Sequence, residues 1–517
     1  MQGATVTSIP AAVRIAAAMF GDKPALIDGM LRLSFEDLDR ETDRLAAGFV
    51  AAGVMPGDRV AIWAPNRAEW VLACLGAQAA GGVIVPLNTR LKGREAQFIL
   101  NRSRARVLIM VRRFLNMDYE RELSGLHLPH VARRIILDTE DWAVLLNAAA
   151  PGDRDVAAAR RAALRAADPS DIIFTSGTTG EPKGVVCGHG QSVAVFRIWA
   201  ERVGLRAGDR YLIVNPFFHT FGYKAGWLAC ILAGATIYPQ QSLDVAQVID
   251  RIATERITVL PGPPTLFQSL LASPSAAGAD LSSLRLAVTG AASVPPSLIE
   301  RMRGELGITR VLTGYGLTES CGVVTLSAES DSAERVATRC GRAIPGVELR
   351  CVDAHMRDAP TGEAGEILVR GFNVMQGYFE DEAATRSAID PEGWLHTGDV
   401  GRLDEDGYLQ ITDRLKDMYI SGGFNCYPAE IERLMAGHPE VAQVAVIGVT
   451  DERMGEVGRA FVVLRPGSTA TPDDLLAWCR AAMANYKAPR QVVILAALPM
   501  NASGKVVKGE LRGRVGT

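Results

Sequence analysis

The chain has 517 residues, too many for a single hydrophobic core, so its length predicts two or more domains. Its 55 Lys and Arg against 58 Asp and Glu leave a net charge of -3, which excludes a strongly basic surface for nucleic acid or acidic lipid. With 48% hydrophobic and 22% charged residues, the composition is that of a globular protein, and its expected partners are small molecules.

The N-terminus lacks the basic start and long apolar run of a secretory signal, because Arg14 interrupts the one candidate stretch. The uncharged stretch from Trp70 to Leu87 contains the break Gly81-Gly82, so a buried helix followed by a buried strand is expected there in place of a membrane span. Eight cysteines occur without a C-x-x-C pair, which argues against a zinc site or a disulfide framework. A reducing cytoplasm is the expected setting.

Short β-rich runs alternate with helical patterns through most of the first 400 residues. This alternation predicts an α/β fold with doubly wound parallel sheets covered by helices on both faces. The expected strands are residues 59–63, 83–86, 107–110, 171–175, 210–215, 236–239, 259–262 and 284–289. Residues 153–167 are expected to form an exposed helix, and the Gly- and Pro-rich residues 341–407 a small distorted β-barrel or sheet.

A compact α+β unit is expected near the C-terminus. A helix opens at residues 427–432, strands follow at 443–449 and 459–464, and the Thr-Pro-Asp-Asp signal at 471–474 starts another helix. About 100 residues is an ordinary size for a separate domain. The predicted division is an N-terminal domain over residues 1–412, a charged connection over 413–417 and a C-terminal domain over 418–517.

The segment from Thr175 to Gly184 reads Thr-Ser-Gly-Thr-Thr-Gly-Glu-Pro-Lys-Gly and follows a hydrophobic run. Glycines let backbone N–H groups turn toward an anion, hydroxyls add donors, and Lys183 neutralises phosphate charge, so the segment predicts a triphosphate-binding loop. It departs from the G-x-x-x-x-G-K-[ST] pattern, because Pro182 replaces the second glycine. The structural alternative is a flexible loop in solvent.

At this loop the chain resembles the ANL superfamily of adenylate-forming enzymes, which comprises acyl-CoA synthetases, peptide-synthetase adenylation domains and beetle luciferases. Five further motifs of that superfamily follow in order, and the resemblance covers roughly residues 15 to 512. These motifs are Asn-Pro-Phe-Phe-His-Thr-Phe-Gly at 215–222, Thr-Gly-Tyr-Gly-Leu-Thr-Glu-Ser at 313–320, Trp-Leu-His-Thr-Gly-Asp-Val-Gly at 394–401, Asp-Arg-Leu-Lys-Asp at 413–417 and Pro-Met-Asn-Ala-Ser-Gly-Lys at 499–505.

The resemblance implies a site that binds ATP, Mg²⁺ and coenzyme A. Thr175 and Glu319 would hold the metal, a role that suits hard oxygen ligands. The implied catalytic residues are Lys505, Glu319, Lys183 and His219. The implied nucleotide- and coenzyme-binding residues are Thr175, Ser176, Gly177, Thr178, Thr179, Gly180, Lys183, Gly290, Ala291, Ala292, Thr313, Gly314, Tyr315, Gly316, Leu317, Thr318, Asp399, Arg414, Gly422, Gly423 and Lys505.

For several of these residues, the resemblance implies a role different from the one that the residue type alone would suggest. Alone, Asp399 would be a turn residue, His219 an ordinary buried histidine and Lys505 a solvated terminal charge. The resemblance implies that Asp399 bonds the ribose, with Tyr315 against adenine. It also implies that His219 is a gate between the acyl pocket and the pantetheine tunnel.

The implied reaction has two halves. An acid and ATP give an acyl-adenylate and pyrophosphate, and coenzyme A then displaces AMP. In the superfamily the C-terminal domain rotates between the halves, which makes it mobile. Lys416 matches the hinge, Lys505 serves adenylation, and Gly422-Gly423 replaces it for thioester formation.

The acid is expected to lack an amino group, because residues 218–221 offer no carboxylate for an ammonium. Residues 215–226, 260–266 and 422–428 are similar to actinobacterial ligases for the ring propanoate left from steroid catabolism, which places the chain in lipid metabolism. Medium-chain, alicyclic and aromatic acids stay open. Free coenzyme A is the expected acceptor, because the sequence ends soon after Lys505 without a carrier domain; a separate carrier protein is the alternative, and a non-catalytic ATP-binding protein is a further one.

Two further partners are hypotheses. One is a second copy of the chain in a homodimer. The other is a lysine acetyltransferase, because residues 499–505 fit the P-x-x-x-x-G-K pattern at which relatives are acetylated. Acetylation would remove the charge of Lys505 and disable its adenylation contact.

Overall fold

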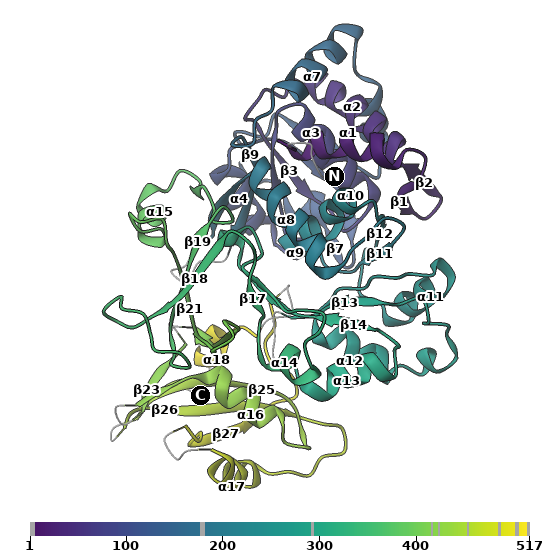
Figure 1. The fold of residues 1–517 in the computed structure, drawn as a ribbon. Coiled ribbons are helices and arrows are strands. Elements are labelled where there is room, and N and C mark those ends of the chain that lie inside the picture. The colour runs from purple at the N-terminus through teal and green to yellow at the C-terminus, as the bar shows by residue number, and fades with distance from the viewer. Residues whose placement is uncertain are drawn as a thin grey trace.

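The computed structural model describes residues 6–175, 181–290, 294–414, 417–421, 424–451, 454–483, 487–501 and 506–513 (Figure 1). The large N-terminal part occupies the upper two thirds of the view, and the chain ends in a smaller unit beneath it. Three groups of sheets build the N-terminal part, and each contributes residues to the candidate site.

The first group is a seven-stranded sheet in which the inner strands are parallel, as the alternating pattern predicted. Its order is β20 (Gly377–Tyr378), β10 (Lys183–Gly188), β9 (Pro169–Thr175), β4 (Val83–Pro86), β3 (Arg59–Trp63), β5 (Ala105–Met110) and β8 (Arg133–Ile136). The pairs of β10 with β9 and β20 are antiparallel. The candidate phosphate loop therefore joins two antiparallel strands.

The second group contains β11 (Arg210–Ile213), β12 (Thr236–Pro239), β1 (Pro24–Asp28) and β2 (Leu31–Ser34), in that order. Beside it lies the parallel pair β13 (Leu286–Val288) and β14 (Arg310–Leu312). The strand expected at residues 259–262 is reduced to isolated bridges from Val259 to Tyr211 and Leu286. The reason is that prolines at 261, 263 and 264 supply no backbone N–H for a longer ladder.

Helices cover both faces of these sheets (Figure 1). The helix over the uncharged stretch, α3, has every residue buried except Glu69, as predicted. No helix among the described residues is long and apolar enough to span a bilayer. The helices up to residue 304 are α1 (Ile9–Phe20), α2 (Phe35–Ala51), α3 (Ala68–Ala79), α4 (Gly93–Arg102), α5 (Tyr119–Glu122), α6 (Glu140–Asn147), α7 (Pro151–Ala163), α8 (His189–Val203), α9 (Thr220–Gly222), η1 (Tyr223–Leu228), α10 (Ala229–Ala233), α11 (Val245–Glu255), α12 (Pro264–Ala272), η2 (Pro274–Gly278) and α13 (Pro296–Gly304).

The third group is β-rich and corresponds to the small distorted barrel expected in this region. A four-stranded antiparallel sheet has the order β18 (Val347–Val352), β19 (Gly365–Gly371), β21 (Leu395–Leu403) and β22 (Leu409–Arg414). A three-stranded sheet precedes it, with β15 (Gly314–Tyr315), β16 (Thr325–Leu326) and β17 (Arg342–Ala343). The short helices of this region are η3 (Thr318–Ser320), α14 (Ala333–Thr338) and α15 (Glu382–Ala388), and a two-stranded hairpin, β6 (Arg113–Phe114) with β7 (Met117–Asp118), lies earlier in the chain.

The C-terminal unit is the expected α+β arrangement. Its sheet contains β24 (Phe424–Cys426), β23 (Tyr419–Ser421), β26 (Gly455–Leu464) and β25 (Val441–Asp451), with β27 (Gln491–Ile494) beside β26. Its helices are α16 (Pro428–Ala436), α17 (Pro472–Ala482) and α18 (Lys508–Gly513). Thr471 and Asp474 form a capping box at the start of α17, as the Thr-Pro-Asp-Asp signal predicted. Two hydrophobic clusters lie wholly within this unit.

Candidate active site

The two ends of the candidate phosphate loop lie opposite one another. Thr175 ends β9, Lys183 begins β10, and the two residues are register partners across the hairpin. A side chain at Gly184 would not fit, because its Cβ would lie 2.7 Å from Cγ2 of Ile172. The hairpin therefore presents a hydroxyl and an ammonium group at the end that carries the phosphate loop.

Glu319, on the short helix η3, lies against the same end of the hairpin. Oγ1 of Thr175 donates a hydrogen bond to Oε1 of Glu319 at 3.4 Å, which brings together the two residues expected to hold a metal. The hydroxyl of Tyr378 donates to the same oxygen at 3.0 Å. Nζ of Lys183 lies 5.2 Å from the centre of the Tyr378 ring, a cation–π contact.

Tyr378 is a site residue that the sequence reasoning missed. It ends β20, which pairs with β10, so the sheet carries it to the phosphate loop. Burial, with the negative charge of Glu319 next, raises the pKa of Tyr378 well above its ordinary value, so the hydroxyl stays protonated and can donate. No spacing signal in one sequence links residue 378 to residue 319.

Tyr315 and Asp399 form the second contact of the site. The hydroxyl of Tyr315 donates to Oδ2 of Asp399 at 2.7 Å, and only 7% of Asp399 is exposed. Asp399 lies within β21 and pairs through its backbone with Arg414 of β22, so it is not a turn residue. A carboxylate with one buried oxygen bonded to a phenol still has acceptor capacity for a sugar hydroxyl.

The residues between Thr313 and Glu319 lie along one edge of the candidate site. Ser327 accepts a hydrogen bond from the backbone N–H of Thr313, and a Cβ placed on Gly290 would lie 3.3 Å from Oγ1 of Thr313. The end of β13 thus approaches the start of this segment. The expected residues that lie here are Gly290, Thr313, Gly314, Tyr315, Gly316, Leu317 and Thr318.

His219 is exposed, which removes the interpretation of an ordinary buried histidine. Its Nδ1 accepts a hydrogen bond from the backbone N–H of Phe221 at 3.2 Å and caps the short helix α9. By contrast, Tyr223 and Lys224, which follow at the start of η1, are completely buried.

Several expected site residues lie outside the described residues, so the structure places none of them. These are Ser176, Gly177, Thr178, Thr179, Gly180, Ala291, Ala292, Gly422, Gly423 and Lys505, together with the hinge residue Lys416. Arg414 is described through its backbone in β22.

The oxygen donors around Glu319 suit Mg²⁺, which typically takes one or two protein oxygens and completes its shell with phosphate and water. The described residues contain no group of three His, Cys, Asp or Glu side chains placed to hold a metal without such help. Beside this cluster, Lys183 and Tyr378 line a pocket of about 380 Å³ that extends to Arg102 on α4 and is also lined by the acidic Glu181 and Asp381. The ammonium group of Lys183 and the carboxylate of Glu319 can hold a phosphate anion next to a hard cation.

Two family descriptions match the chain. Residues 13–379 match the AMP-binding enzyme family, and residues 430–505 match the AMP-binding enzyme C-terminal domain. The first match spans both strands of the phosphate hairpin, Tyr315, Glu319 and Tyr378.

Two curated relatives cover nearly the whole chain. A methyl-dioxo-octahydro-indenyl propanoyl:CoA ligase from Rhodococcus jostii is 48% identical over 98% of both chains. A ligase of the same name from Mycobacterium tuberculosis is 49% identical over 98% of both chains. The solved o-succinylbenzoate coenzyme A synthetase from Bacillus subtilis, in complex with ATP and magnesium ion, is 31% identical, with a TM-score of 0.82 over 97% of this chain and 99% of that one. The chain therefore belongs to the AMP-binding enzyme family of the ANL superfamily and, within it, to the acyl-CoA synthetases.

Proposed function

We propose that the acid joined to coenzyme A is a propanoate carried on a steroid-derived bicyclic ring. The support is the identity of 48% and 49%, over 98% of the chain, to two relatives whose names specify such an acid. The observation that carries the adenylation half is the cluster in which Thr175 and Tyr378 both donate to Glu319.

In this proposal Glu319 and Thr175 hold Mg²⁺ next to the triphosphate. The bound ion supplies positive charge that offsets the charge of the phosphates and of the departing pyrophosphate. Tyr378 keeps one oxygen of Glu319 in a fixed direction through its 3.0 Å hydrogen bond. Lys183 adds a second positive charge at the hairpin.

The adenylation step needs placement and charge more than proton transfer. A carboxylic acid has a pKa of about 4.3 in water, so it is ionised at pH 7 and attacks the α-phosphate without a general base. Tyr315 and Asp399 hold the adenosine, and Lys505 binds the carboxylate and the α-phosphate. Catalysis then comes from in-line placement and electrostatic stabilisation.

The thioester step requires access for the coenzyme A thiol. We propose domains at 1–412 and 418–517 that rotate about residues 413–417, so that Gly422 and Gly423 replace Lys505 near the adenylate. Support comes from the two hydrophobic clusters that the C-terminal unit forms from its own side chains. The exposure of His219 fits a gate on the path of the thiol.

A panel of acids tests the substrate. The full chain is incubated with ATP, Mg²⁺, coenzyme A and one acid at a time, and AMP, pyrophosphate and acyl-CoA are measured. The dioxo-octahydroindenyl propanoate is expected to give the highest kcat/KM, and the same bicyclic acid without its ketones is the matched control.

Other results would change the proposal in defined ways. A higher kcat/KM with decanoate or ferulate would replace the steroid-derived acid and leave the ligase in place. Pyrophosphate exchange without acyl-CoA formation would indicate a carrier protein as acceptor. No exchange with any acid would overturn adenylation by this chain.

Regulation by a lysine acetyltransferase at Lys505 and a cytoplasmic location remain proposals drawn from the sequence. Acetylation would remove the charge that binds the carboxylate and α-phosphate. Treatment with acetyl-CoA and an acetyltransferase should abolish pyrophosphate exchange and add one acetyl group to the peptide that contains Lys505. Unchanged exchange by the acetylated protein would count against this regulation.

A further inference from the structure

A completely buried ion pair lies in the core behind the candidate site. Nζ of Lys224, on η1, is 3.0 Å from Oδ1 of Asp171, on β9, and neither side chain is exposed. Burial by itself would lower the pKa of Lys224, but the negative charge of Asp171, the neighbouring Cys187 and Cys321 and the hydrogen bond to Asp171 together raise that pKa, so Lys224 is charged at neutral pH. A buried charge pair costs desolvation energy, and hydrophobic residues of similar volume are often as stable.

The acidic partner lies on the strand that leads into the phosphate hairpin. Asp171 precedes Thr175 by four residues on β9 and is the register partner of Cys187 on β10. Its other oxygen, Oδ2, accepts a hydrogen bond from Oγ of Ser170 at 2.6 Å. The carboxylate is therefore fixed relative to both strands of the hairpin.

The ammonium group also reaches the turn that carries Glu319. Nζ of Lys224 donates to Sγ of Cys321 at 3.6 Å, and Cys321 follows Glu319 by two residues. Cys321 has a φ of 55°, a left-handed conformation that a non-glycine residue adopts when its surroundings impose it. The contact from Lys224 therefore falls on the turn that carries Glu319.

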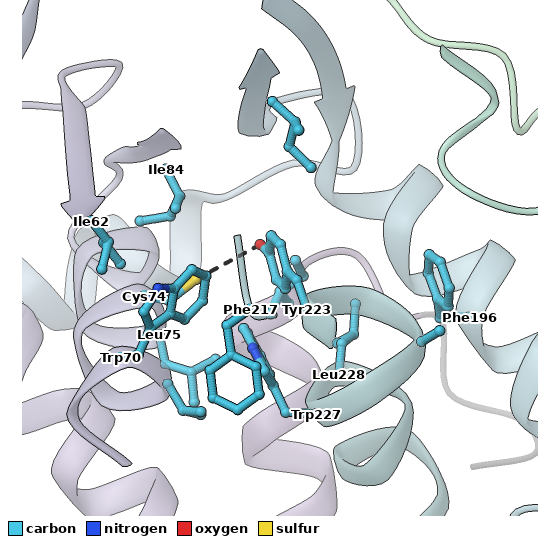
Figure 2. Packing of buried hydrophobic residues seen from close by; sticks show 14 of the residues in the cluster. Ile62, Trp70, Cys74, Leu75, Ile84, Phe196, Phe217, Tyr223, Trp227 and Leu228 are labelled. Carbon is cyan, nitrogen blue, oxygen red and sulfur yellow. Dashed lines mark hydrogen bonds between the residues drawn. The ribbon is translucent and has the colours of Figure 1, made fainter. Parts of the chain in front are cut away.

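The third segment is the helix after His219. Tyr223, the neighbour of Lys224 on η1, accepts a hydrogen bond at its hydroxyl from Nε2 of Gln78 at 2.8 Å. Figure 2 shows this hydroxyl turned toward Cys74 of α3 within a cluster of tryptophan and phenylalanine rings. Gly322, with a φ of 96°, leaves no room for a side chain against Thr220 of α9. The helix is thus held firmly on both sides of Lys224.

A single ammonium group therefore joins three segments that are distant in sequence. We propose that Lys224, through Asp171 and Cys321, is a positioning residue that sets Glu319 relative to Thr175 and ties both to the helix that follows His219. The inference rests on the proposed metal role of Glu319 and Thr175. In this arrangement the acyl side of the site and the triphosphate side share one buried charge.

The variant Lys224→Met removes the ammonium group and keeps much of the side-chain volume. The half-saturating Mg²⁺ concentration for pyrophosphate exchange is expected to rise about tenfold, which is typical when a group behind a metal ligand is lost. Thioester formation from supplied acyl-adenylate should stay near the wild-type rate, because that half does not use the triphosphate site.

A second variant separates positioning from folding. Lys224→Met with Asp171→Leu leaves no unpaired buried charge, so its thermal stability should recover toward that of the wild type. Its Mg²⁺ requirement should stay raised, because the contact with Cys321 is still absent. If stability and Mg²⁺ requirement recover together, the pair is only part of the core and the inference is wrong.

Arg161→Met is the matched control. Arg161, on α7, has a side chain that is 5% exposed and pairs with Asp39 and Asp43 of α2. This variant should lose stability without a change in the Mg²⁺ requirement, and the same behaviour by Lys224→Met would overturn the inference. Glu319→Gln tests the metal role of Glu319 separately from the positioning role of Lys224. An unchanged Mg²⁺ requirement in this variant would refute the metal role itself.

Discussion

Glu319 receives hydroxyl groups from two strands that are 203 positions apart in sequence, Thr175 at the end of β9 and Tyr378 at the end of β20. Both donors reach the same carboxylate oxygen, and within the described part of the chain the other oxygen has no hydrogen-bond partner, so it can face a cation. A carboxylate that is already oriented loses less entropy when it binds a metal than one that rotates freely. Orientation of this one side chain is therefore the residue-scale basis of the site.

Tyr378→Phe removes one of the two donors and keeps the ring beside Lys183. The half-saturating Mg²⁺ concentration in pyrophosphate exchange is expected to rise about tenfold, because Glu319 loses a supporting hydrogen bond. Tyr408→Phe is the matched control, since the hydroxyl of Tyr408 donates to Oδ1 of Asp331 at 2.7 Å in another part of the chain. Equal Mg²⁺ requirements in the two variants would contradict the role of Tyr378.

At the residue scale, contacts between residues of known motifs were predicted from the sequence, whereas contacts that depend only on the fold were not. Glu319 and Thr175 were expected together, and the structure brings them together. Tyr378 and the pair of Lys224 with Asp171 were not found, because each depends on strand pairing or helix placement that leaves no spacing signal. The exposure of His219 likewise depends on how the chain turns after β11.

At the scale of elements, α8 begins at a buried histidine. Nδ1 of His189 accepts a hydrogen bond from the backbone N–H of Ile9, the first residue of α1, at 3.4 Å. Burial lowers the pKa of His189 from its ordinary value of 6.5 to about 4. The imidazole is therefore neutral in the native state, and it joins two helices that cover the sheets.

This histidine predicts a pH-dependent stability. Its native pKa is below its unfolded pKa, so between about pH 6.5 and pH 4 the unfolded chain binds a proton that the native chain does not. Stability is full above the higher value and falls as the pH drops through this window, by an amount on the order of 3 kcal/mol. Urea titrations at pH 7 and pH 4.5 measure it, and His189→Gln should reduce the difference between them.

The elements themselves were well predicted where periodicity was clear. The expected strands at 59–63, 83–86 and 236–239 match β3, β4 and β12 to the residue. The expected strand at 259–262 was wrong beyond Val259, because an apolar run does not show which backbone N–H groups the prolines remove. The π-helix η1 was also missed, since nothing in the local sequence distinguishes it from an α-helix.

At the scale of the whole molecule, the C-terminal unit has its own hydrophobic clusters, and the proposed catalytic Lys505 belongs to it. Lys505→Ala is expected to abolish pyrophosphate exchange and to leave thioester formation from supplied acyl-adenylate near the wild-type rate. The physical reason is that, in the proposed mechanism, the two half-reactions use different faces of this unit. Equal loss of both half-reactions would refute the division of labour between Lys505 and the segment at Gly422.

The antiparallel hairpin of β9 and β10 also bears on how a product leaves the enzyme. Where a phosphate loop opens a helix, the aligned backbone dipoles of that helix keep attracting the anion after the reaction. Here a strand follows the loop, and α8 begins only after β10 has ended. In the proposed mechanism pyrophosphate is held by the donors of the loop and by Lys183, without the dipole of a helix. The proposed rotation of the C-terminal unit would take the charge of Lys505 away from the site and shorten the residence time of pyrophosphate, which would couple product release to the second half-reaction.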